Sequence, residues 1–274
     1  MGGALFSQPW RPLPKNNENL NFVNSYQPQN NEISSLRILL HGPAGAGKSS
    51  FISSVDSVLQ GRISGRALSD TIGGKSFTQI YKTFRFRKNA NHFHPFIMTD
   101  IMGLEKNERN GVPLEDLKLA LKGHVKEGYK FIPGQQISDP SYNSSPTLDD
   151  RVHVLVCVFP AGSASLISDE VVKKMREVRL AASEMGIPQL AILTKVDEAC
   201  PNVKQSLKNI YKSKYLKEQA EKFSMLLGLP LNCIFLVKNY ESELTTTEDV
   251  NAPILYALRQ MITFGEDFLN DLNS

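Results

Sequence analysis

One short segment constrains this chain more than any other: residues 42–49, GPAGAGKS, which follow the apolar run at 36–40. In the pattern G-x-x-x-x-G-K-[ST], glycines turn backbone N–H groups inward around phosphate oxygens, while the lysine reaches the outer phosphates and the hydroxyl binds Mg²⁺. Lys48 and Ser49 are predicted to take these two roles. Apolar residues at helical spacing continue through 49–59, so we expect a helix whose N-terminus faces the phosphates. The chain is therefore predicted to bind a nucleotide.

Composition narrows the class of protein. The chain has 274 residues, of which 41% are hydrophobic, so a single large domain with a packed core is expected. Its net charge of +3 is too small to indicate a nucleic-acid partner. Cys157, Cys200 and Cys233 have no metal-ligand spacing and are interpreted as reduced thiols. No apolar run reaches the length of a membrane span and no secretory signal is visible, so we expect a cytoplasmic protein.

The order of patterns predicts the fold. Residues 1–34 are rich in Asn, Gln and Pro and are expected to form a flexible N-terminal arm, which Phe6 and Trp10 could dock onto the body. Residues 35–274 are expected to form one P-loop domain of the GTPase-like type. Strand patterns at 36–41, 80–86, 95–100, 152–159, 189–194 and 232–237 alternate with helical patterns at 49–59, 169–184, 213–227 and 252–272. This alternation indicates an α/β fold, a three-layer, doubly wound and mostly parallel sheet.

Strand composition suggests positions in that sheet. The strands at 152–159 and 233–237 are almost continuously apolar and are expected at its centre. Residues 81–87 alternate apolar with polar and are expected nearer an edge, with a basic face that is either a partner surface or simply solvated. Residues 105–150 carry a helical pattern at 114–121 and then a polar, proline-containing stretch, so we interpret them as an insertion.

A second motif, D-x-x-G, follows the strand at 95–100. Asp100 at that strand end is predicted to hold Mg²⁺ through water, and Gly103 to let its amide approach the γ-phosphate. A switch threonine should complete the metal site. Thr71, Ser76 and Thr78 are candidates, of which Thr78, just before the second strand at 80–86, is chosen.

A third motif, Thr194-Lys195-Val196-Asp197, closes the strand at 189–194, where a purine would lie in such a sheet. One carboxylate accepts from both N1–H and the exocyclic amine of guanine, whereas adenine presents an acceptor at N1. Asp197 is therefore predicted to select guanine, and the stem of Lys195 to lie along the base. Taken alone, the motif also fits an ordinary junction between strand and loop.

Lys238 and Asn239 follow the last strand, where GTPases usually place a loop that contacts the guanine oxygen. The familiar Ser-Ala-Lys is not present, and an ordinary strand end fits equally well. The full set predicted to bind nucleotide is Gly42, Ala44, Gly45, Ala46, Gly47, Lys48, Ser49, Ser50, Gly103, Thr194, Lys195, Asp197, Lys238 and Asn239. The predicted metal ligands are Ser49, Asp100 and Thr78, and the predicted catalytic residues are Lys48, Thr78 and Arg66.

These motifs, in this order, resemble a small GTPase domain over roughly residues 35–270. More closely, RILLHGPAGAGKSSFISSV, DIMGLE, DRVHVLVCVF, LAILTKVD and APILYALRQMITFGEDFLNDL resemble the interferon-induced protein 44 and 44-like family. That resemblance implies a cytoplasmic, interferon-inducible protein with a GTP-binding motif, linked to antiviral and immune responses. Longer members of the family carry an additional N-terminal TLDc domain.

The residues expected to carry out hydrolysis depart from the usual GTPase pattern. Leu104 stands where Ras-like enzymes place a glutamine that orients water, so intrinsic hydrolysis is expected to be slow. Arg62 and Arg66 follow the first helix of the domain, and we hypothesise that one of them, Arg66 by choice, acts on the phosphates in cis, although solvated arginines are commoner. His92 and His94 could form a metal pair but have no evident third ligand.

Three functions are compatible with this sequence. The first is a slow or partner-dependent GTPase switch that uses GTP or GDP with Mg²⁺ and contacts a protein effector, or a second copy, through its switch loops. The second is a non-catalytic scaffold that keeps the nucleotide as a structural ligand. The third, an ATP-dependent P-loop enzyme, leaves Asp197 without a role.

Overall fold

The computed structural model describes residues 4–64, 80–101, 112–132, 135, 137, 140–164 and 166–272. Its strands are β1 (Leu36–His41), β2 (Lys82–Arg87), β3 (Phe93–Asp100), β4 (Val154–Pro160), β5 (Gln189–Thr194) and β6 (Ile234–Leu236). Its helices are α1 (Asn16–Ser25), α2 (Lys48–Gln60), α4 (Leu114–Leu121), α5 (Asp169–Glu184), α6 (Val196–Ala199), α7 (Pro201–Gln205), α8 (Lys214–Leu227) and α9 (Glu248–Asp271).

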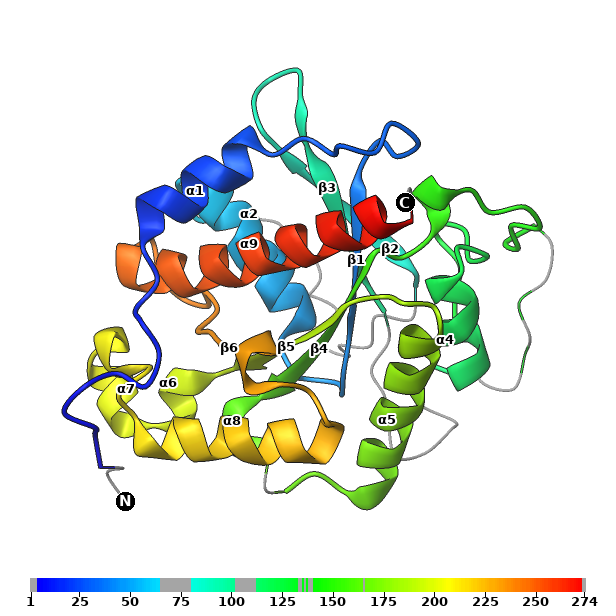
Figure 1. The fold of residues 1–274 in the computed structure, drawn as a ribbon. Coiled ribbons are helices and arrows are strands. Elements are labelled where there is room, and N and C mark those ends of the chain that lie inside the picture. The colour runs from blue at the N-terminus through cyan, green and yellow to red at the C-terminus, as the bar shows by residue number, and fades with distance from the viewer. Residues whose placement is uncertain are drawn as a thin grey trace.

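The strands form one sheet in the order β2-β3-β1-β4-β5-β6. β2 runs antiparallel to β3, and every other neighbouring pair is parallel. Helices cover both faces (Figure 1). The expectation of a three-layer, doubly wound and mostly parallel α/β sheet is confirmed, because buried strands joined by helical crossovers give this arrangement.

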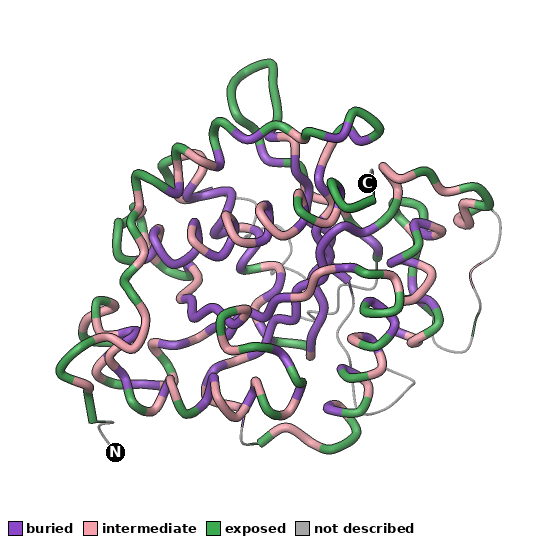
Figure 2. The backbone as a smooth tube through the Cα atoms, viewed as in Figure 1, coloured by how far each residue is buried: buried purple, intermediate pink, exposed green. Residues whose placement is uncertain are grey.

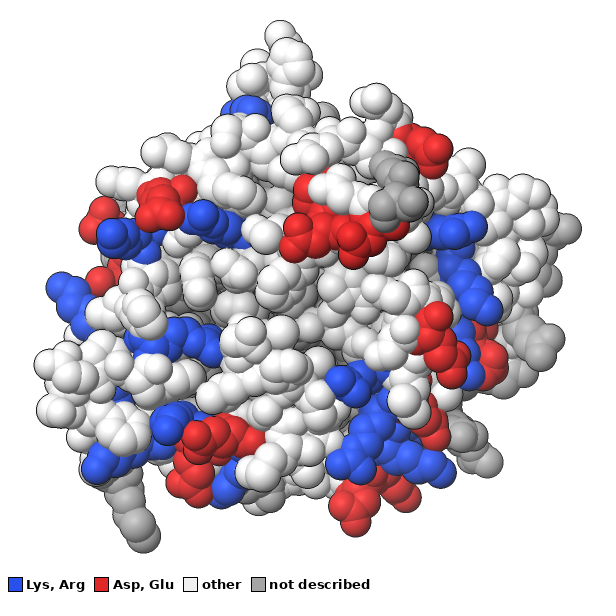
Figure 3. Space-filling view, viewed as in Figure 1, with Lys and Arg blue, Asp and Glu red and all other residues white. Residues whose placement is uncertain are grey.

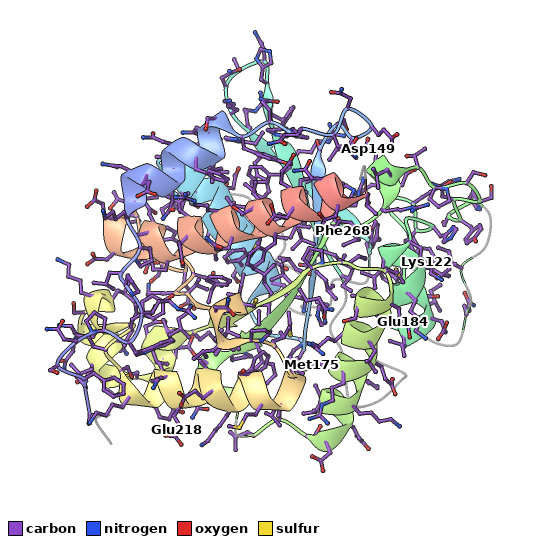
Figure 4. The ribbon with its side chains drawn as sticks, viewed as in Figure 1. Lys122, Asp149, Met175, Glu184, Glu218 and Phe268 are labelled. Atoms are coloured by element: carbon purple, nitrogen blue, oxygen red, sulfur yellow. The ribbon has the colours of Figure 1, made fainter. Side chains whose placement is uncertain are left out.

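Alternate residues of the central strands bury into two separate cores. Ile38 and Leu40 of β1 face α2 and α9, whereas Leu39 faces α4, α5 and α8. Met175, labelled in Figure 4, points from α5 into the second core. The strands at the centre of the molecule are buried along almost their whole length (Figure 2). Burial on both faces explains why these strands are continuously apolar in sequence.

One expected strand position is wrong. The strand expected at 233–237 was placed at the sheet centre because it is apolar throughout, yet β6 lies at an edge. Arg11 covers this edge, donating from Nη1 to the Ile234 carbonyl and from Nη2 to the Leu231 carbonyl, both at 2.6 Å. Its guanidinium also lies 5.0 Å from the centre of the Trp10 ring. An edge strand sealed in this way is buried like a central one, so its composition could not reveal its position. β2 at the opposite edge agrees with expectation.

The expected flexible arm also differs from the structure. Within residues 1–34, the described part is docked: Leu5 pairs with Ser213 in an antiparallel bridge, and Trp10 packs edge-on against Tyr211. Residues 16–25 form helix α1, which lies along α9 (Figure 1). The weak apolar periodicity of α1 hid it, because only Asn19 and Val23 are buried.

Polar contacts fix the rest of this segment. Glu266 of α9 accepts from the Tyr26 hydroxyl at 2.8 Å and from the Gln29 amide at 2.7 Å. Asp149, labelled in Figure 4, accepts from the Ser34 amide at 2.9 Å. In the described part of the chain, no helix combines the length and apolarity needed to cross a bilayer.

His153 joins the start of β4 to β1. Its Nδ1 accepts from the Arg37 amide and its Nε2 donates to the Leu148 carbonyl, both at 2.9 Å. Burial, together with the Arg37 charge, lowers the pKa of His153 to about 4 despite the bond to Leu148. A proton on Nδ1 would face the Arg37 N–H, so the folded state requires the neutral ring.

We predict that folding stability falls as the pH is lowered from 6.5 towards 4. The unfolded histidine takes up a proton near pH 6.5 and the folded one only near pH 4, so stability is complete above pH 6.5 and is lost below it. His153 alone would contribute a loss of about 2 kcal/mol at pH 5. Urea unfolding across this pH range measures the loss. An NMR titration in which the His153 ring protonates near pH 6.5 in the folded protein would contradict the assignment.

Candidate nucleotide-binding site

The loop at residues 42–49 joins β1 to α2 at the carboxyl edge of the sheet. Gly42, Gly45 and Gly47 all have positive φ, at 140°, 72° and 91°. A Cβ on Gly42 would lie 2.1 Å from the carbonyl oxygen of Val158 in β4, so this position cannot carry a side chain without displacing backbone. The glycines thus let the loop curl closely against the neighbouring strand, with the N-terminus of α2 opening into it.

Lys48 begins α2 and is buried, with 7% of its surface exposed. Its ammonium donates to the carbonyls of Gly42 and Pro43, each at 3.1 Å, so the side chain folds back over the loop. Behind it, burial and then the Lys48 charge lower the pKa of His41 to about 3. His41 is therefore neutral, and Lys48 supplies the positive charge.

Ser49 and Asp100 meet beside the loop. The Ser49 hydroxyl donates to the Asp100 carboxylate in a short hydrogen bond. β1 and β3 pair in register with Leu40 opposite Asp100, which places the end of β3 next to the start of the loop. Two predicted oxygen ligands for Mg²⁺ thus lie together.

The third motif packs onto the first. The Thr194 hydroxyl at the end of β5 donates to the Ala46 carbonyl at 2.6 Å and bridges loop and strand. Lys195 follows with φ 57°, the one positive φ outside glycine among the described residues. A left-handed lysine is strained, which is common where function fixes the backbone. Asp197 then lies half-buried in the first turn of α6, with no hydrogen bond or ion pair to the described part of the chain.

The two residues after β6 behave differently from each other. Asn239 donates from Nδ2 to the Gly47 carbonyl at 3.2 Å, and its buried Oδ1 has no partner among the described residues. Lys238 is paired with Glu243. Burial raises the pKa of Glu243, but hydrogen bonds from the Glu241 amide and Lys238 outweigh it and lower that pKa to about 2. Asn239 therefore lies against the loop, whereas Lys238 is engaged elsewhere.

Two further residues, which the motifs did not indicate, brace the site. The Tyr240 amide donates to the Ser54 hydroxyl at 2.9 Å, and that hydroxyl donates to the Ser50 carbonyl at 2.7 Å. The segment after β6 is thus tied to the first turns of α2. Neither residue belongs to a phosphate or base motif, so only the three-dimensional arrangement reveals the link.

Several predicted positions fall outside the described residues: Arg66, Thr71, Ser76, Thr78, Gly103 and Leu104. Arg62 is described and exposed, just beyond the far end of α2. The length of that helix places it about 20 Å from Lys48, which disfavours a direct role on the phosphates. His92 lies on an exposed turn, whereas His94 is buried beside Phe96. Among the described residues no three His, Cys, Asp or Glu side chains gather as a metal site.

Known proteins resemble the chain along most of its length. Human interferon-induced protein 44 is 34% identical over 256 residues, 92% of this chain and 57% of that protein. The human 44-like protein is 33% identical over 255 residues, 91% of this chain and 56% of that protein. This chain is a homologue of the interferon-induced protein 44 and 44-like proteins. The resemblance indicated by the motifs is confirmed, and the chain spans a little over half the length of these relatives.

A mouse homologue, also named interferon-induced protein 44, is 35% identical over 260 residues, 92% of this chain and 60% of that protein. No protein-family model matches the chain.

Solved structures of Toc33 from Arabidopsis thaliana also align with the chain. A dimerization-deficient mutant gives a TM-score of 0.49 at 15% identity, covering 94% of this chain and 96% of that one. A complex with GDP and Mg²⁺ gives 0.46 at 15% identity, covering 92% and 93%. Both scores lie below 0.5, so the description of the fold as GTPase-like rests on the sheet order and the phosphate loop.

We predict different costs for alanine at two glycines of the loop. Gly42→Ala should lower the free energy of unfolding by about 3 kcal/mol, because its Cβ meets the Val158 carbonyl at 2.1 Å. A Cβ on Gly45 would have nothing within 4 Å, so Gly45→Ala should lower the free energy of unfolding only by the strain of a left-handed alanine, about 1 kcal/mol. Chemical denaturation of both variants measures the difference. Equal destabilisation would show that the loop does not press against β4.

Proposed function

We propose that this chain is a guanine nucleotide-binding protein that uses Mg²⁺ and acts as a slow or partner-dependent GTPase switch. The observation that supports it best is the convergence of three separated segments: Thr194 and Asn239 both hydrogen-bond to carbonyls of the phosphate loop, and Ser49 pairs with Asp100. By homology we further propose that it is interferon-induced, cytoplasmic and part of an antiviral or immune response.

The residues of this site suit the triphosphate of a bound nucleotide. Lys48 already satisfies its charge on two loop carbonyls and would exchange them for phosphate oxygens. Lys48 stands at the N-terminus of α2, where the helix favours anions. Ser49 and Asp100 would hold Mg²⁺, with Thr78 as the proposed switch ligand and Gly103 as a γ-phosphate contact. The bound metal would neutralise phosphate charge.

Base selection is proposed for Asp197. Its carboxylate would accept from N1–H and the exocyclic amine of guanine, while the stem of Lys195 lies along the base face. The strained Lys195 backbone directs the chain from β5 into α6, which carries Asp197. Asn239, with one amide atom on Gly47 and the other lacking a partner among the described residues, would complete the base side. Lys238 would contact the base only if its ion pair with Glu243 breaks.

A scaffold that keeps GTP or GDP as a structural ligand is the second candidate. The presence of Leu104 instead of a water-orienting glutamine favours it. Arg66 remains the proposed cis arginine, since Arg62 is remote. Under either candidate, a protein effector or a second copy would bind through the loops that sense the γ-phosphate.

Calorimetric titration of nucleotide-stripped protein with GTP, GDP and ATP in Mg²⁺ tests occupancy and base choice together. We predict that GTP and GDP bind and that ATP binds at least about 100-fold more weakly, because two hydrogen bonds to a carboxylate are lost. Asp197→Ala should remove this preference. Glu198→Ala, which deletes the adjacent exposed carboxylate, should preserve it. Equal affinities for GTP and ATP in the native chain would overturn the assignment.

Phosphate release under multiple turnover separates the switch from the scaffold. We predict slow release from GTP above the level of a Lys48→Ala control, since Lys48 is the residue proposed to neutralise charge on the outer phosphates. Release equal to that control, with GTP still bound by the native chain, would favour the scaffold.

A further inference from the structure

A cleft of about 900 Å³ lies along β2, the edge strand opposite β6. None of the described residues proposed to bind nucleotide lines it. It combines part of the β2 edge with the segment after α4, and its described lining includes three aromatic rings, Tyr81, Phe84 and Phe93. Its volume is that of a site for a ligand or a short peptide segment. The charged residues in its described lining are Arg37, Lys82, Arg85, Lys126, Glu127 and Asp150.

The pairing of β2 with β3 shows which backbone groups point into this region. Thr83 lies opposite Thr99, and their hydroxyls approach to 3.3 Å, as in a pair that shares no ladder hydrogen bonds. The N–H and C=O of Thr83 therefore point away from β3. Arg85, two residues along and opposite Ile97, has the same orientation. The outer edge of β2 thus turns the hydrogen-bonding groups of its strand towards the cleft.

The chain itself already uses part of this edge. Tyr81 donates to the Tyr129 carbonyl at 2.7 Å and accepts from the Gly128 amide at 2.9 Å, in the manner of an added strand. The next outward amide, that of Thr83, donates to both carboxylate oxygens of Glu127, at 2.9 and 3.0 Å. A side-chain carboxylate therefore occupies the place where strand pairing stops.

We propose that this cleft is a docking groove for an extended, acidic segment of a partner protein, which adds to β2 and displaces the Glu127 carboxylate. The edge gives the backbone pairing, and Glu127 marks a position that accepts a carboxylate. Among the described lining residues, four basic side chains stand against two acidic ones, and this positive balance attracts such a segment, which would compete with the partners that Lys82 and Arg85 already have. Asp150 is engaged by Thr147 and Asn143, which leaves Glu127 as the acidic group to be replaced.

An acidic peptide suits these features better than nucleic acid does. A strand edge recognises a polypeptide backbone, which a nucleic acid lacks. Moreover, Lys and Arg lie among Asp and Glu over the face in view in Figure 3, and the described lining of the cleft likewise mixes basic with acidic side chains. In an extended segment, alternate residues face the same side, so glutamates at every second position would meet the side of β2 that carries Thr83 and Arg85.

The test uses the full chain and a fluorescein-labelled eight-residue peptide of alternating glutamate and valine. The control peptide has glutamine at each glutamate position. Fluorescence anisotropy should show saturable, salt-sensitive binding of the acidic peptide only. Glu127→Ala should tighten binding at least threefold by removing the internal competitor, and Glu218→Ala, an exposed carboxylate on α8 (Figure 4), should change nothing. Arg85→Glu should weaken binding at least tenfold, and Lys208→Glu should not.

NMR of ¹⁵N-labelled protein locates the peptide, with shifts expected at the Thr83 and Arg85 amides. Thermal unfolding and GTP titration of each variant control for misfolding, and they keep this test separate from that of nucleotide binding. Three results would each overturn the proposal: equal binding of the two peptides, no effect of Glu127→Ala, or shifts centred elsewhere. Stronger binding of a labelled oligonucleotide at the same amides would also overturn it, in favour of a nucleic-acid site.

Discussion

The close approach of Gly42 to the Val158 carbonyl is the constraint on which the site depends. It presses the loop after β1 against β4, and the Thr194 hydroxyl then holds the same loop from β5 through the Ala46 carbonyl. Three parallel strands therefore define the loop before any ligand is present. Because these strands are buried on both faces, their ends cannot shift independently, and the arrangement is preorganised.

The sequence was most informative where local chemistry and position agree. Tertiary information was not needed to predict the glycine loop, helix α5 or strand β5, because the residues of each segment specify its structure. The placement of Asp100 beside Ser49 followed from the order of motifs along a parallel sheet. Positions on residues outside the described ranges, such as Thr78 and Arg66, remain predictions.

The sequence was least informative where distant segments meet. Helix α1 buries few apolar side chains and is held by Glu266 and Arg259 from α9, so no periodicity indicated it. β6 looks central because Arg11 seals its edge from a segment more than 200 residues away. The pairing of Lys238 with Glu243 likewise depends on how one loop turns. Each case requires knowing what packs against the segment, which a pattern of single residues does not contain.

The hydrogen bonds from Arg11 to the edge of the sheet at β6 affect the order in which the domain folds during synthesis. Arg11 is synthesised well before its partners, because the carbonyls it binds lie 220 and 223 residues later. Residues 4–11 must therefore wait, without their native partners, until almost the whole domain has been made. Contacts of such separation form slowly. Residues 4–11 are thus expected to be among the last parts of this domain to reach their native place.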